Sequence, residues 1–117
     1  MITVYGIPNC DTVKKARAWL AAEGIEAVFH DFKKQGVPPD ALDRWLQTVG
    51  WEKLVNRKGT TWRKLDAATQ TSVHDAASAR ALMVAQASVI KRPVVDWGST
   101  TTVGFDVAHW ATLRPAV

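Results

Sequence analysis

The start of the chain alternates strand, turn, helix and strand, and this order restricts the possible folds more than any other feature. Residues 2–7 are mostly β-branched or aromatic and lead into Pro8 and Asn9, which favour a turn. Residues 11–23 carry apolar side chains at helical spacing, and residues 26–32 form a second apolar segment. A β-turn-α-β order of this length predicts two parallel strands joined by a crossover helix.

The middle of the chain has a different pattern, with helical signals and no alternating strand pattern. Residues 39–49 carry apolar side chains at helical spacing, and Pro39 suits the start of this helix. We expect Thr60 and the threonine after it to cap a short helix, and Asp75 to cap another over residues 76–86. About residues 38–88 are therefore predicted to form an all-helical insertion.

The last part returns to strands. Residues 94–97 and 101–104 are separated by Gly98 and Ser99, which is a hairpin signal. Asp106 is positioned to cap a final helix. The whole pattern predicts an α/β fold, with a mixed four-stranded sheet flanked by helices and interrupted by the helical insertion. At 117 residues, the chain is expected to form a single domain.

The chain contains one cysteine, Cys10, at the predicted junction between the first strand and the first helix. A thiolate there would face the unpaired N–H groups of the helix start, and Lys14 would add positive charge one turn along. Asp11 beside the sulfur would act in the opposite direction. Because no second cysteine is present, any redox cycle through Cys10 needs a thiol from another molecule. An inert cysteine that packs as a small apolar residue is the alternative.

Three segments carry a family resemblance: residues 5–16 (YGIPNCDTVKKA), 57–65 (RKGTTWRKL) and 90–94 (IKRPV). In order and spacing they resemble the ArsC/Spx/YffB family, and its YffB branch most closely. The resemblance implies a thioredoxin-like fold with a helical insertion. It also implies that Cys10 is a nucleophile, as in arsenate reductases of the family, where glutathione and glutaredoxin complete the reduction.

The same resemblance assigns further residues to the site. Arg57 and Arg92 match two arginines that bind the oxyanion, and guanidinium groups suit this role because their donors fit oxyanions and carboxylates. Pro93 matches the cis proline that lies beside the reactive cysteine, and the hydroxyl of Thr12 is placed to donate to the thiolate. The third arginine of arsenate reductases would fall near Gly104 and the residue after it, where this sequence has none. This difference argues against arsenate as the substrate.

The leading hypothesis is a glutathione-dependent thiol reductase that uses Cys10 on an oxidised or anionic substrate. An Spx-like regulator that binds RNA polymerase is a second hypothesis, although Val13 replaces the second cysteine of the Spx redox switch. An arsenate reductase that works with glutathione and glutaredoxin is a third. The net charge of +4 favours anionic partners in general.

Other classes of protein are disfavoured by the sequence. No bound cofactor is expected, and the three histidines are too scattered to suggest a metal site. No apolar run is long enough to span a membrane, and no secretory signal is evident, so a cytoplasmic location is expected. Nothing in the sequence calls for more than a monomer.

Overall fold

The computed structural model describes residues 2–114, which divide into two compact units. The sheet unit comprises the described residues up to Lys34 and those from Arg92 onward, and the helical unit is Gln35–Lys91. The predicted insertion, about residues 38–88, therefore corresponds closely to the helical unit.

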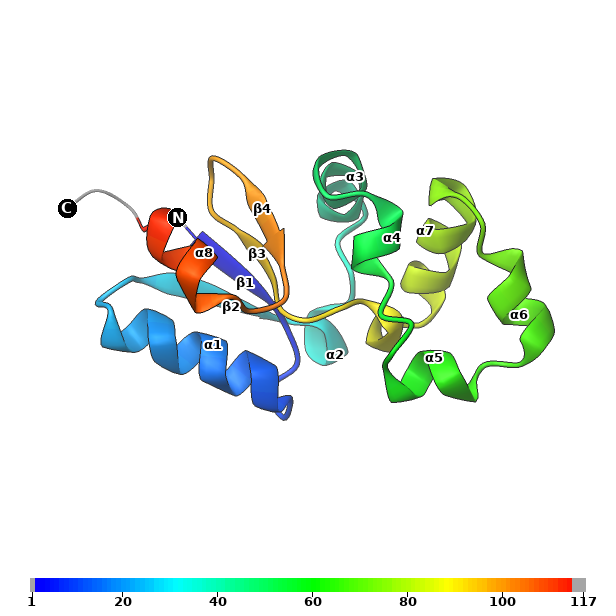
Figure 1. Cartoon of the computed structure of the whole chain (residues 1–117), viewed down its shortest axis with the longest axis horizontal. Helices are drawn as coiled ribbons and strands as arrows, with labels where there is room; N and C mark the ends of the chain where they lie inside the picture. The colour runs from blue at the N-terminus through cyan, green and yellow to red at the C-terminus, as the bar shows by residue number, and fades with distance from the viewer. Residues whose placement is uncertain (1, 115–117) are drawn as a thin grey trace. The chain divides into compact units, whose positions relative to one another are not determined.

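The sheet unit contains the β-turn-α-β segment and the C-terminal hairpin and helix (Figure 1). Its elements are β1 (Ile2–Gly6), α1 (Asp11–Ala22), β2 (Ala27–Asp31), β3 (Val94–Asp96), β4 (Thr101–Val103) and α8 (Val107–Thr112). Helix α2 (Phe32–Gln35) follows β2 directly at the boundary between the units.

The four strands have the order β2-β1-β3-β4. Strand β1 is parallel to β2, with Gly6 opposite Asp31, and antiparallel to β3, with Tyr5 opposite Val94. Strands β3 and β4 are also antiparallel. The sheet is therefore mixed and flanked by helices, which confirms the predicted fold class.

Helices α1 and α8 cover one face of this sheet, because both contribute to a single apolar core (Figure 1). The core consists of Ile2, Val4, Ala16, Leu20, Val95, Trp97 and Trp110. The rings of Trp97 and Trp110 meet edge to face at 5.1 Å, and Trp19 packs on Trp110 from α1. This packing holds α1, and with it the residue at its start, against the sheet.

The helical unit consists of short helices around its own apolar core. Its elements are α3 (Pro39–Thr48), α4 (Trp51–Leu54), α5 (Thr60–Lys64), α6 (Ala67–Ser72), α7 (Ala76–Ala85) and the 3₁₀ helix η1 (Ala87–Val89). Helices α3, α4 and α7 contact one another and bury Trp45, Leu54 and Met83 completely. Val55, directly after α4, and Ile90, directly after η1, form an isolated antiparallel bridge within the unit. Within residues 2–114, no helix is both long enough and apolar enough to cross a bilayer.

Most predicted helix starts are confirmed, but one is wrong. Asp75 caps α7 in a reciprocal capping box with Ser78, and Asp106 caps α8. The cap of α5 is Gly59 and not a threonine. A side chain at this position would collide with the amide of Asn56, since a Cβ on Gly59 would lie 2.8 Å from Asn56 Nδ2.

Two other boundaries differ from the predictions for local reasons. The second strand ends at Asp31, one residue early, because the Asp31 carboxylate accepts the N–H of Lys33 and α2 begins. Strand β3 ends at Asp96 because Trp97 turns into the core, where its Nε1 donates to Thr102 Oγ1 at 3.0 Å.

Candidate active site

Cys10 is the residue that caps the start of α1. Strand β1 ends at Gly6, a turn follows, and Cys10 has extended backbone angles (φ −98°, ψ 126°) immediately before the helix. Its carbonyl accepts the first helical hydrogen bond, from the N–H of Lys14 at 2.9 Å. The side chain is half-buried. The sulfur therefore lies at the positive end of the helix and is still accessible from outside.

The pKa of the Cys10 thiol lies below its ordinary value because several attractions together outweigh burial. Burial is the largest single influence, and it raises the pKa. The N–H of Val13, the hydrogen bond and charge of Arg92, and the N–H of Thr12 lower the pKa. The sulfur does not form a capping hydrogen bond of good geometry, so we attribute the effect of the two N–H groups to their dipoles. A thiolate is the nucleophilic form of cysteine, so this environment favours reactivity.

Arg92 and Pro93 approach this position from the start of β3. The bond between them is cis, as the family resemblance implied, and Pro93 is fully buried. The carbonyl of Pro93 accepts the N–H of Gly104 at 2.9 Å, which ties the segment to the end of β4. Because β3 pairs with β1, Arg92 reaches the end of β1, where its guanidinium group lies close enough to the Cys10 sulfur to lower the pKa of the thiol.

Gly6 is a component of the site that sequence reasoning missed. A Cβ on Gly6 would lie 2.9 Å from Val13 Cγ2 and 3.9 Å from Arg92 Cβ. Only glycine therefore lets the end of β1 approach the first turn of α1 and the Arg92 segment this closely. The available signal in the sequence was the presence of Gly6 in the first of the three family segments.

Thr12 and Lys14 lie in the first turn of α1. The backbone N–H of Thr12 helps to lower the pKa of Cys10, and a hydrogen bond from the Thr12 hydroxyl to the thiolate stays a prediction. Lys14 is exposed on α1, and Arg92 supplies the charge that lowers the Cys10 pKa. Roles for both side chains toward a bound substrate stay predictions.

Arg57 belongs to the helical unit, whereas Cys10, Arg92 and Pro93 belong to the sheet unit. It is exposed, and its guanidinium carbon lies 5.1 Å from the centre of the Trp51 ring, a cation–π contact. The structure thus brings Cys10 and Arg92 together, with Pro93 adjacent to Arg92, and the approach of Arg57 to Cys10 stays a prediction.

The position near which the resemblance predicted a third arginine is occupied by packing residues. Gly104 is buried, and the Phe105 ring packs edge to face on Trp110 at 4.8 Å. No guanidinium group can project from this position. Among the described residues, no group of three histidine, cysteine, aspartate or glutamate side chains is arranged to hold a metal ion.

In sequence and in fold, the chain is similar to several known proteins. The sequence profile of the ArsC family matches residues 5–113. The structure of the YFFB (PA3664) protein is 44% identical and has a TM-score of 0.93, covering 98% of this chain and 100% of that chain. An arsenate reductase (ArsC) related protein from Brucella melitensis is 53% identical, with a TM-score of 0.74 over 95% of this chain and 92% of that one.

A more distant relative has a regulatory description. The global transcriptional regulator Spx of Streptococcus pyogenes is 25% identical over 109 residues, which span 91% of this chain and 79% of the relative. The structural neighbours confirm the thioredoxin-like fold.

Proposed function

The chain belongs to the ArsC family, and from this premise we propose that it is a glutathione-dependent thiol reductase with Cys10 as its nucleophile. The observation that carries the proposal is the half-buried thiol of Cys10 at the start of α1, whose pKa is lowered with the help of the Arg92 side chain close to it. The described relatives support the coarser conclusion that the family contains thiol-based reductases and regulators.

The chemistry follows from the presence of one cysteine in the chain. The Cys10 thiolate attacks one sulfur of an oxidised substrate disulfide, and the other substrate thiolate leaves. Glutathione thiolate then attacks the substrate sulfur of this mixed disulfide, which releases Cys10 as a thiolate. A second glutathione, or glutaredoxin, frees the substrate thiol. The two electrons that reduce the substrate thus come from glutathione, and no second protein cysteine is required.

Arg92 has two roles in this proposal. It keeps Cys10 in the thiolate form before attack, and its positive charge attracts the carboxylates of glutathione or an anionic substrate. Arg57 is proposed to provide a second anion-binding group from the helical unit. Pro93, through the cis bond that precedes it, is proposed to position Arg92 for this role.

Intact-protein mass spectrometry after incubation with oxidised glutathione tests the proposal. The Cys10 thiolate attacks the glutathione disulfide, one glutathione thiolate leaves, and the protein gains one glutathionyl group. The matched control is Cys10→Ser, which should gain none. Alkylation of Cys10 should also be faster at neutral pH than alkylation of a thiol peptide. Absence of the adduct together with peptide-like alkylation would refute the proposal.

The similarity to Spx favours one second candidate, a transcriptional regulator that binds RNA polymerase. Val13 replaces the second cysteine, so such a regulator would act without an internal disulfide. Co-purification with RNA polymerase that persists in Cys10→Ser would favour this function. An arsenate turnover assay with glutathione and glutaredoxin distinguishes arsenate reduction from the disulfide reductase and the regulator. We expect no turnover, because Phe105 packs on Trp110 where the resemblance predicted a third arginine.

A further inference from the structure

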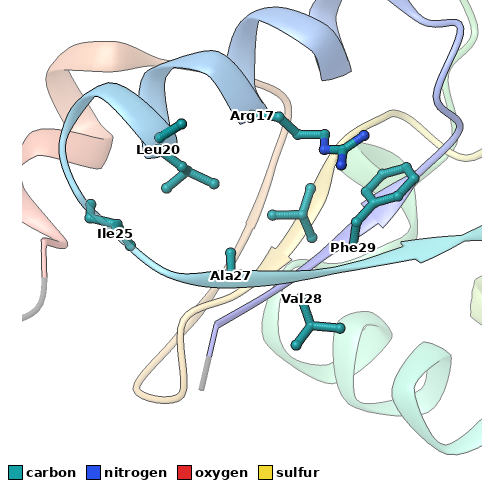
Figure 2. Close-up of a pocket in the computed structure, with 8 residues that line it drawn as sticks. Arg17, Leu20, Ile25, Ala27, Val28 and Phe29 are labelled. Carbon is teal, nitrogen blue, oxygen red and sulfur yellow. The ribbon is translucent and has the colours of Figure 1, made fainter.

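A groove of about 180 Å³ opens on the sheet unit between α1 and β2 (Figure 2). Its walls are apolar except for one cation. The residues that shape it are Arg17, Leu20, Ala21, Ile25, Ala27 and Phe29. A cavity of about 150 Å³ holds a benzene ring, so this groove has room for one large apolar side chain and is too small for a drug-sized molecule.

Among the residues that the structure describes, the cation at the mouth of the groove, Arg17, has no acidic partner. The Arg17 guanidinium carbon lies 4.1 Å from the centre of the Phe29 ring, as Figure 2 shows, and its side chain is exposed. Within residues 2–114, no carboxylate is recorded in contact with Arg17. A guanidinium group stacked on an aromatic ring can still donate hydrogen bonds in its own plane. A ligand could therefore place an anionic group against Arg17 and an apolar side chain in the groove next to it.

The groove borders the edge of the sheet. Strand β2 is terminal in the strand order, so its outer edge pairs with no other strand of the described part of the chain. Such an edge can pair with the backbone of an extended peptide, whose alternate side chains then face the α1 side. Backbone pairing of this kind selects a polypeptide over a small apolar metabolite.

The groove and Cys10 lie on the same flank of α1. Cys10, Lys14, Arg17 and Ala21 follow one another at spacings of four, three and four residues, which places them on one stripe of the helix. At 1.5 Å per residue, Arg17 and Ala21 are about 10 and 16 Å along the axis from Cys10. An extended peptide covers this distance with about three to five residues.

We propose that this groove, with the β2 edge, binds a polypeptide substrate whose oxidised cysteine reacts at Cys10. An apolar side chain about four residues from that cysteine occupies the groove, and an acidic neighbour contacts Arg17. The inference rests on the proposed function, since it assigns the substrate class to the same reactive sulfur. In the reaction, Cys10 thiolate attacks the peptide-side sulfur of a disulfide, and the other thiolate leaves.

The test uses peptides whose single cysteine is joined by a disulfide to 2-nitro-5-thiobenzoate. Attack by Cys10 releases the coloured nitrothiobenzoate, so the rate is followed by absorbance. Two peptides carry Leu-Glu four residues before or after the cysteine, and matched peptides carry Ser-Glu. The small disulfide of nitrothiobenzoate itself is the reference substrate. We expect one of the two Leu peptides, the one whose chain direction suits the groove, to react about tenfold faster than its matched Ser peptide. This factor corresponds to the burial of one apolar side chain.

Variants on the same helix supply matched controls. Ala21→Trp fills the groove and Ala22→Trp adds the same side chain beside it, at a position that does not line the groove. Arg17→Glu reverses the charge at the mouth, and Lys15→Glu makes the same charge change elsewhere on α1. Ala21→Trp and Arg17→Glu should each remove most of the preference for the Leu peptide, and the two controls should keep it.

Reaction with the small disulfide separates the two proposals. Suppose that every variant reacts normally with the small disulfide. The groove proposal alone is then overturned if the parent shows no preference for the Leu peptides, or if that preference survives both Ala21→Trp and Arg17→Glu. If Cys10 reacts with neither the peptides nor the small disulfide, the proposed function fails and the groove proposal fails with it. If Ala21→Trp instead breaks a dimer detected by sedimentation, the groove joins two copies of the chain and the peptide proposal is overturned.

Discussion

Replacing Gly6 by alanine tests how the end of β1 shapes the thiol site. The backbone of Gly6 does not have a positive φ, so alanine meets no backbone strain there. The added Cβ would instead lie 2.9 Å from Val13 Cγ2, closer than carbon atoms normally approach. Val13 is fully buried in the first turn of α1, so it cannot rotate away into solvent.

The magnitude follows from two opposing effects. Overpacking of a core position costs about 1–3 kcal/mol. Replacing glycine by alanine stabilises the folded state by about 0.4–1 kcal/mol through the unfolded chain. Gly6→Ala should therefore lower the free energy of unfolding by about 0.5–2 kcal/mol. Because the N–H of Val13 helps to lower the Cys10 pKa, its displacement should also raise that pKa and slow alkylation at neutral pH.

The assay is urea unfolding together with the Cys10 alkylation rate, measured in a double-mutant cycle. Val13→Ala removes the methyl group that collides, at a cost of about 1–3 kcal/mol for the two buried methyl groups lost. The double variant Gly6→Ala/Val13→Ala should cost less than the sum of the single variants by about 1 kcal/mol. Additive costs, or a Gly6→Ala variant as stable and reactive as the parent, would refute the close-approach explanation.

Three further predictions concern other contacts. Arg92→Gln removes a positive charge beside the Cys10 sulfur, so the pH profile of Cys10 alkylation should move to higher pH. An unchanged profile would exclude Arg92 as a cause of the lowered pKa of Cys10. Thr102→Val leaves the buried Trp97 N–H without its acceptor and should cost about 1–3 kcal/mol in urea unfolding, whereas stability equal to the parent would contradict that role. Hydrogen bonds from Ser78 hold the pKa of the Asp75 carboxyl below its usual range. The parent should therefore lose thermal stability as pH falls through this lowered pKa, and Asp75→Asn should lose less. Identical dependence of thermal stability on pH in the two proteins would contradict this role of the hydrogen bonds.

Much of the fold was predictable because local patterns agree with tertiary packing. The helical spacing of residues 11–23 matches a helix that buries Val13, Ala16 and Leu20 against the sheet. The aspartate caps at positions 75 and 106 are local hydrogen bonds, so the sequence contains all the information needed to predict them. Helix α6 was missed because it buries no side chain and depends on its Asp66 cap, so it has no apolar periodicity.

The site was predictable only in part. The position of Cys10 before a helix follows from the local pattern, and the family resemblance supplied Arg92 and the cis bond to Pro93. The approach of Gly6 to Val13 and the groove beside β2 could not be predicted in this way. Both depend on how closely a strand and a helix pack, and this distance is set by the whole core and not by any one segment.

A direct titration of Cys10 tests the central claim, which is that the fold stabilises its thiolate. Thiolate absorbance of the parent minus that of Cys10→Ser would be measured against pH, in the folded protein and again in urea. The folded-state midpoint should lie below the unfolded one. Stability relative to Cys10→Ser should then increase as pH rises through the folded pKa and be complete above the unfolded pKa. A folded midpoint equal to or above the unfolded one would contradict the account.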